Sequence, residues 1–324
     1  MKVYIEYDLA NTSGKGKFLS RLTREWDKIG IKYSDNQKGC DVRLAITRYR
    51  TKSKLPTAIR IDGAHAMMPI NEINGSKRKK VAESTKWKNK HTTECINKAK
   101  VVIWQSEFCK KAGHSFWKIK PKKEYVIFNG ASKDEFLPRA PEKRIVMSAY
   151  WKKRPHKRLN EMLEIALDYV ESHTDVYFDV LGDIEIAVPS HKNIVYHGYT
   201  NHKGMAQVFA KAAGMLNLCY SDWCPNAVVE ALVAGVPVIC TANHGASEIV
   251  GDSGIVLDVG DDVINNRMPT QAQIPIKNKE PIYNALDTVL KGKSTFSEPE
   301  HLDISKIALK YAGVLSAIKE RRKK

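Results

Sequence analysis

Short runs of β-branched and aromatic residues recur along the chain, and longer stretches with apolar residues at helical spacing separate them. Residues 2–8 form the first such run, which predicts a strand. A helix to about Gly30 follows, because Phe18, Leu22 and Trp26 fall on one helical face. Further strands are predicted at residues 41–46, 58–61, 101–104, 145–150, 176–182, 194–198 and 215–218. This repetition predicts an α/β protein with two Rossmann-like domains.

Two carboxylates mark the most informative stretch, which runs from Tyr220 to Thr241. Asp222 and Glu230 stand eight positions apart, with a helix-start signal at Pro225 and Asn226 between them. Apolar residues at helical spacing follow, and the stretch ends in a short apolar strand. We therefore expect a loop, a helix and a strand, with Asp222 facing the helix N-terminus. Free N–H groups at such an end attract anions.

This stretch resembles the E-x7-E motif of family 4 of the retaining glycosyltransferases, which have the GT-B fold. The resemblance implies two Rossmann-like domains that face a cleft, and a nucleotide-diphosphate sugar, a UDP- or GDP-sugar, as donor. It places Asp222, where the family usually has Glu, at the donor sugar and Glu230 at the nucleotide ribose. Asn226 at the helix start joins this donor-binding set.

The loop before the helix predicted at about Leu159 is rich in cations. Members of the family hold the leaving diphosphate with an Arg and a Lys about five residues apart. Lys157 matches the Lys, and the Arg position falls on Lys152 by spacing, with Arg154 as its competitor. Fixed cations at this place would stabilise the negative charge that develops on the diphosphate.

Glycines mark two further segments of the expected donor site. Residues 11–17 follow the first strand and resemble the family's first loop, so Gly14 and Gly16 are expected beside the donor phosphates. Residues 243–250 resemble the family's G-G-x-x-E segment, which implies that the N–H groups of Gly245 and Ala246 approach the same phosphates.

The strand predicted at residues 58–61 ends in Asp62, Gly63, Ala64 and His65. Ligands of open α/β sheets bind beyond the carboxyl ends of strands. In similar enzymes a His or an Asp from this region lies beside the reacting sugar. We therefore expect His65, Asp62 and Asp222 to be the catalytic residues, and the residues leave open which of the first two contacts the reacting centre.

Charge is distributed unevenly over the 324 residues, whose net charge is +17. Residues 1–140 hold 31 Lys and Arg against 14 Asp and Glu, and the remainder is balanced. This excess predicts a polyanionic acceptor bound by the first domain. The expected acceptor-binding residues form basic runs interleaved with Trp: Arg48, Arg50, Lys77, Arg78, Lys79, Lys80, Lys86, Trp87 and Lys88.

Nucleic acid is the favoured acceptor, for example a hydroxymethylated base in DNA that must be flipped out of the duplex to react. The alternatives are a membrane lipid or cell-surface glycan precursor at an anionic membrane surface, and a non-catalytic nucleic-acid-binding protein on a decayed transferase fold. Residues 1–140 would bind the acceptor, residues 141–300 the donor, and residues 301–324 would form a tail helix that packs on the first domain.

We expect no cofactor and no metal, because no D-x-D pair is present and the cations named above can do a metal's electrostatic work. The six cysteines are scattered without metal-binding spacing, which indicates free thiols. The N-terminus begins a strand and does not resemble a secretory signal, so a cytoplasmic protein is expected. No pattern indicates a protein partner.

Overall fold

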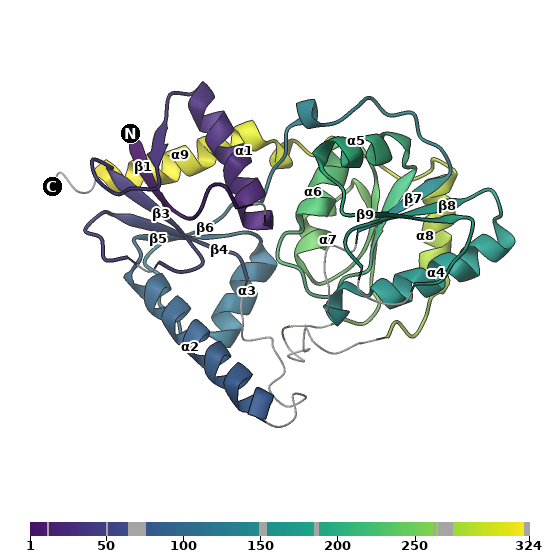
Figure 1. Ribbon diagram of the computed structural model, residues 1–324, viewed down its shortest axis with the longest axis horizontal. Helices are drawn as coiled ribbons and strands as arrows, with labels where there is room; N and C mark the ends of the chain where they lie inside the picture. Colours follow the sequence, from purple (N-terminus) through teal and green to yellow (C-terminus); the bar gives the residue numbers. More distant parts are fainter. Residues whose placement is uncertain are drawn as a thin grey trace. The chain divides into compact units, whose positions relative to one another are not determined.

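The computed structural model describes residues 1–11, 13–49, 51–63, 76–148, 154–184, 188–261, 264 and 275–320, with the backbone alone for 76–83 and 320. The chain divides into two compact units, one of Met1–Ala131 with His301–Lys324 and one of Ser132–Glu300 (Figure 1). The division precedes the boundary expected after residue 140, so the segment between the two belongs to the second unit. This segment hydrogen-bonds within the second unit, where Ala140 N donates to Ala210 O at 2.8 Å.

The first unit is built on six parallel strands in the order β2-β1-β3-β4-β5-β6. Each register is parallel, as expected for strands joined by crossovers. The neighbours of β1 are β2 and β3, so the direction in which strands are added reverses beside β1. The strands are β1 (Lys2–Glu6), β2 (Lys32–Ser34), β3 (Val42–Ile46), β4 (Thr57–Ile61), β5 (Val101–Trp104) and β6 (Glu124–Val126).

Helices cover both faces of this sheet, with α1 and α9 on one face and α2 and α3 on the other (Figure 1). The C-terminal α9 packs directly on α1: Trp26 Nε1 donates to Ala308 O at 3.2 Å, and the Phe18 and Tyr311 rings lie 5.6 Å apart. The apolar face read from the sequence is therefore the buried one. The helices are α1 (Gly14–Lys28), α2 (Ser76–Lys98), α3 (Glu107–Phe116) and α9 (Ile304–Glu320).

The second unit has another six-stranded parallel sheet, in the order β12-β11-β10-β7-β8-β9. Strand β7 and strand β10 are neighbours, although α4 and α5 lie between them in sequence. This is the reversal point at which open α/β sheets bind ligands. The strands are β7 (Arg144–Ser148), β8 (Tyr177–Leu181), β9 (Ile194–Gly198), β10 (Gly214–Asn217), β11 (Val238–Thr241) and β12 (Gly254–Leu257).

The helices of the second unit bury long apolar side chains against this sheet, and α4 and α8 share one core with it. The helices are α4 (Leu159–Ser172), α5 (His202–Lys211), α6 (Asn226–Val233), α7 (Gly245–Val250) and α8 (Glu280–Leu290). The predicted α/β class with two Rossmann-like units is confirmed. Within the described residues, no helix is both long and apolar enough to cross a lipid bilayer.

Candidate functional site

Lys157 and Asp222 meet at the carboxyl edge of the second sheet. Lys157 ends a short 3-10 turn, η4 (Pro155–Lys157), between β7 and α4, and Asp222 lies in the loop between β10 and α6. The Lys157 ammonium forms an ion pair with Asp222 Oδ2. Asp222 Oδ1 accepts from the N–H of Trp223 at 2.9 Å. A cation and a carboxylate far apart in sequence are thus fixed at the reversal point of the sheet.

The ion pair holds both groups in their charged forms. Burial disfavours the charged forms, but the attraction between them outweighs it. The pKa of Lys157 is therefore raised and that of Asp222 lowered. The two side chains keep 21% and 16% of their surface exposed, so a ligand can reach them. A cation that is charged at every pH near neutrality suits the binding of a phosphate.

His244 lies behind this pair as a neutral imidazole. Its Nδ1 accepts from the N–H of Ala246 at 3.3 Å, so Nε2 carries the proton and donates to Thr241 Oγ1 at 3.0 Å. Thr241 Oγ1 in turn donates to Cys219 O at 2.6 Å. Burial lowers the pKa of His244 to about 4. The chain of bonds joins the end of β11 to the loop after β10.

We predict that His244 makes the stability of the second unit fall with acidity. The unfolded state takes up a proton below pH 6.5 and the folded state only near pH 4, so stability is retained above 6.5 and lost as pH falls, by about 1.4 kcal/mol per pH unit. His244→Asn keeps an acceptor for the Ala246 N–H and removes the titration, so its unfolding free energy in urea should fall less steeply from pH 6.5 to 4.5. A slope equal to that of wild type would contradict this assignment. His202→Asn, at an exposed histidine of the same unit, is the control.

Gly245 and Ala246 do not offer their N–H groups as the sequence predicted. Gly245 N donates to Asp222 O at 2.8 Å, and Ala246 N is bonded to His244. A Cβ on Gly245 would lie 2.0 Å from Trp223 O, so this glycine lets the 222–223 loop approach α7. In this structure both amides hold Asp222 and His244 in place, and no N–H of these two residues remains for a phosphate.

Glu230 and Asn226 lie on α6, beside this loop. Asn226 is the first residue of α6, which begins where the Pro-Asn signal predicted. Glu230 is only 3% exposed, on the second turn of the helix. The N-terminal turn of α6 directly follows the loop that carries Asp222, so both acidic residues of the motif belong to one loop-and-helix unit.

Arg158 is a buried cation that the sequence analysis did not identify. It is 1% exposed, and its guanidinium binds both carboxylate oxygens of Asp261 at 2.7 Å. It also lies 4.9 Å from the centre of the Tyr220 ring. Because Arg158 follows Lys157 directly, this bidentate pair anchors the loop that carries Lys157. Arg154, the alternative to Lys152 as the residue that binds the diphosphate, is exposed at the start of η4. Lys152 lies outside the described residues.

Asp62 lies at the carboxyl end of β4 in the first unit, at the centre of a polar cluster. Arg60 Nη1 is 2.8 Å from Asp62 Oδ1, and Lys15 Nζ is 3.8 Å from Asp62 Oδ2. Gln105 also donates to Asp62. Lys15 donates to Thr47 Oγ1 at 2.7 Å, and burial lowers its pKa. His65 lies outside the described residues.

Lys15 and Arg60 were missed, although each had a signal in the sequence. Lys15 stands between the two glycines that were chosen, and Arg60 is a charged residue in the apolar run of β4. The segment at 14–16 is helix and not the expected loop, because Ser13 caps α1 at Gly14. A Cβ on Gly16 would lie 1.6 Å from Asn11 O, so Gly16 serves the packing of the preceding loop.

The expected acceptor-binding residues lie on α2 and on the segment after β3. Arg48 lies 5.6 Å from the Trp87 ring centre, and Trp87 is 60% exposed. Lys86 is exposed and Lys88 half-buried on the same helix. Lys77, Arg78, Lys79 and Lys80 are helical, but their side chains, like all of Arg50, lie outside the described residues. The structure thus brings Arg48 to Trp87 and leaves the remaining side chains of this set untested.

The described residues also show how the potential metal ligands and the cysteines are placed. Among the described residues, no group of three or more His, Cys, Asp or Glu is placed to hold a metal ion. All six cysteines are buried free thiols, as their spacing predicted.

Comparison with known proteins finds a family match for part of the chain and similar folds among solved structures. Residues 142–265 match the family described as Glycosyl transferases group 1. No curated protein sequence matches significantly. The crystal structure of Anabaena Alr3699/HepE with UDP-glucose is similar at a TM-score of 0.65 and 13% identity, over 98% of this chain and 99% of that one.

Two further solved structures share the architecture. WaaG, a glycosyltransferase involved in lipopolysaccharide biosynthesis, gives a TM-score of 0.61 at 13% identity, over 99% of this chain and 98% of that one. Sucrose-phosphate synthase of Thermosynechococcus elongatus gives 0.53 at 14%, over 94% and 75%. The fold is that of the GT-B glycosyltransferases. Within that fold, residues 142–265 of this chain match a family of glycosyl transferases.

Proposed function

We propose that this glycosyltransferase moves a sugar, with retention of configuration, from a UDP-sugar to a nucleic acid. The observation that carries the donor half of this proposal is the Lys157–Asp222 ion pair at the reversal point of the second sheet. Retention and the ribose-binding role of Glu230 rest on the resemblance to family 4. The choice of UDP rests on the similar fold of Anabaena HepE, which was solved with UDP-glucose.

The second unit would hold the donor. In this proposal Lys157 and Arg154, with Lys152, bind the diphosphate, and Glu230 accepts hydrogen bonds from the ribose hydroxyls. Asn226 and the first turn of α6 lie beside these groups. The fixed Lys157 supports this arrangement, because a cation already held in place loses little freedom when a phosphate binds.

The reaction breaks the bond between the anomeric carbon and the diphosphate oxygen. That oxygen keeps the electron pair, the acceptor oxygen forms the new bond, and the acceptor's proton is released. Lys157 stabilises the developing negative charge. Because both oxygens of Asp222 already have partners, on Lys157 and the Trp223 N–H, we assign Asp222 the role of positioning Lys157.

The first unit would hold the acceptor. The excess positive charge of residues 1–140 supports a polyanion, and the exposed Trp87 beside Arg48 supports one with bases that can stack. Asp62, Lys15 and His65 are assigned to the acceptor hydroxyl. We place the reaction in the cytoplasm, where the six buried thiols would remain reduced.

The test of this function is UDP release from UDP-glucose with different acceptors. Duplex DNA with hydroxymethylated bases should accelerate the release and gain the mass of one hexose per modified base, whereas unmodified DNA of the same sequence should do neither. Acceleration by anionic vesicles that carry a lipid acceptor, and not by DNA, would favour the lipid or glycan alternative. DNA binding without UDP release from any UDP- or GDP-sugar would favour the non-catalytic alternative.

A further inference from the structure

A cationic pocket lies in the first unit, at the amino ends of β4 and β5. Its cavity has a volume of about 590 Å³, within the range of small-ligand sites. It is distinct from the Asp62 cluster, which lies at the carboxyl end of β4. Six basic side chains line it: Arg43, Lys52, Lys54, His91, Lys98 and Lys100. Its walls come from the connection between β3 and β4, the end of α2 and the start of β5.

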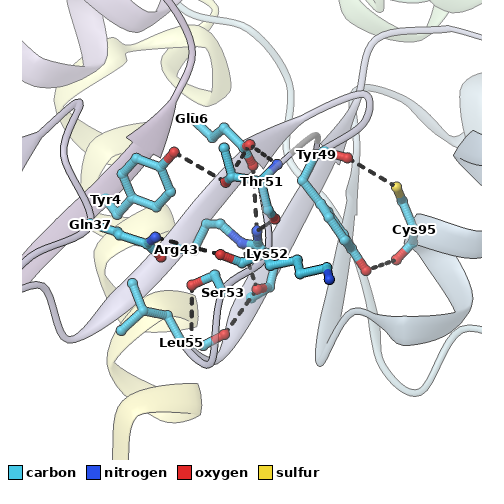
Figure 2. Close-up of polar contacts among 11 residues, drawn as sticks. Tyr4, Glu6, Gln37, Arg43, Tyr49, Thr51, Lys52, Ser53, Leu55 and Cys95 are labelled. Carbon is cyan, nitrogen blue, oxygen red and sulfur yellow. Dashed lines mark hydrogen bonds and ion pairs between the residues drawn. The ribbon is translucent and has the colours of Figure 1, made fainter.

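The wall formed by residues 51–57 is held in place by hydrogen bonds (Figure 2). Glu6 Oε1 accepts from Thr51 N at 2.8 Å and from Thr51 Oγ1 at 2.7 Å. Arg43 donates to Thr51 O at 3.1 Å and to Thr57 Oγ1 at 2.9 Å. The Arg43 guanidinium also lies 4.1 Å from the centre of the Tyr49 ring. The wall is therefore preorganised.

Most of the basic side chains that line the pocket have no ion-pair partner among the described residues. Arg43 has a partner in Glu6 at 3.5 Å. Lys52, Lys54, Lys98 and Lys100 are exposed and form no ion pair with any residue that the structure describes. The pocket has no Asp or Glu in its lining. Four like charges around one hollow repel each other, and an anion between them would relieve that repulsion.

An independent observation comes from His91, which also lines the pocket. Its Nδ1 is buried and has no hydrogen-bond partner among the described residues, and such groups are rare in folded proteins. The His91 ring lies 5.2 Å from that of Trp87, whose side chain is 60% exposed. The pocket wall thus holds a polar atom that needs a partner, and through the His91 ring it continues to an exposed aromatic surface at Trp87 that can take a base.

We propose that this pocket binds a single strand of nucleic acid, with backbone phosphates on Lys52, Lys54, Lys98 and Lys100 and a base against Trp87. The inference rests on the proposed nucleic-acid acceptor for its ligand, and it adds an anchoring site away from the chemistry. Phosphates on lysines with a base on an aromatic ring are the usual means of binding single strands without sequence preference. The pocket is concave, so it suits a strand better than a flat membrane surface. Binding to a membrane would also require apolar side chains that insert between the lipids.

The test is the salt dependence of binding, measured by fluorescence anisotropy of a labelled single-stranded oligonucleotide from 50 to 300 mM NaCl. Each phosphate contact adds about 0.7 to the slope of log affinity against log salt for single strands. Lys98→Gln with Lys100→Gln should therefore reduce the slope by about 1.4. The control is Lys192→Gln with Lys203→Gln, which removes the same charge from exposed positions of the second unit and should leave the slope unchanged. Trp87→Leu should weaken binding about tenfold.

Equal slopes for the two double variants would overturn the pocket assignment. So would wild-type binding to vesicles of anionic lipid without binding to the oligonucleotide. Neither readout uses glycosyl transfer. If the pocket variant binds the oligonucleotide like wild type while hydroxymethylated DNA is still glucosylated, the pocket proposal fails alone. If the pocket variant shows the expected smaller salt slope while no DNA is glucosylated by the wild type, the proposed function fails alone.

Discussion

Replacing Lys157 by methionine will lower the rate of UDP release from UDP-glucose about 100- to 1000-fold, the usual effect of removing one preorganised group that stabilises developing charge. The loss should appear in kcat, because the charge on the diphosphate grows as the bond breaks. Methionine keeps the apolar stem of the side chain. The measurement is steady-state UDP release, with circular dichroism to verify that the variant is folded.

Lys211→Met is the matched control for this variant. Lys211 lies in the same unit with 60% of its side chain exposed, paired with Glu142 at 3.1 Å. Its removal should leave kcat within about twofold, since exposed pairs contribute little. Asp222→Asn should reduce kcat less than Lys157→Met, because it frees Lys157 without removing its charge. A kcat for Lys157→Met within tenfold of wild type would refute the role given to this cation.

Replacing Arg158 by methionine will destabilise the second unit by about 3–5 kcal/mol, because Asp261 is left as a buried charge without its partner. Arg158 has a left-handed backbone conformation with φ of 54°. Methionine adopts this conformation with the same backbone strain as arginine, so the loss of stability reports on the ion pair. The free energy of unfolding in urea measures the loss.

A double variant separates this ion pair from packing. Arg158→Met with Asp261→Leu removes both charges, and apolar replacement of a whole buried pair is often nearly neutral. The double variant should therefore regain most of the stability lost by the single one. A double variant as unstable as Arg158→Met, or a single loss below 1 kcal/mol, would show that the pair does not anchor the loop.

Local patterns were sufficient for most elements of the fold. The strand predicted at 101–104 and the helix predicted to begin at Asn226 occur at those residues. Both are short segments with strong signals, an apolar run in the first and a Pro-Asn start in the second. The structural division after Ala131 depends on tertiary contacts, because the segment that follows it hydrogen-bonds to the end of a helix some 70 residues later.

Of the candidate site, the sequence could predict the residues that belong to a recognisable motif but not the contacts between them. Lys157 and Asp222 were each selected by resemblance, but their contact is a tertiary one that spacing does not reveal. The Arg158–Asp261 pair joins residues 103 positions apart, so no window of sequence could indicate it. The amides of Gly245 and Ala246 were assigned to phosphates because glycine permits close approach. In the folded chain, what approaches is the protein's own 222–223 loop.

The central claim is that the sugar nucleotide binds the second unit beside the helix that begins at Asn226. Hydrogen–deuterium exchange with and without UDP-glucose tests it directly, because amides covered by the ligand or ordered by it exchange more slowly. The account predicts protection at residues 154–158 and 222–233, which Glu230→Gln reduces. Protection confined to the first unit, or equal protection in Glu230→Gln at the same ligand concentration, would contradict it.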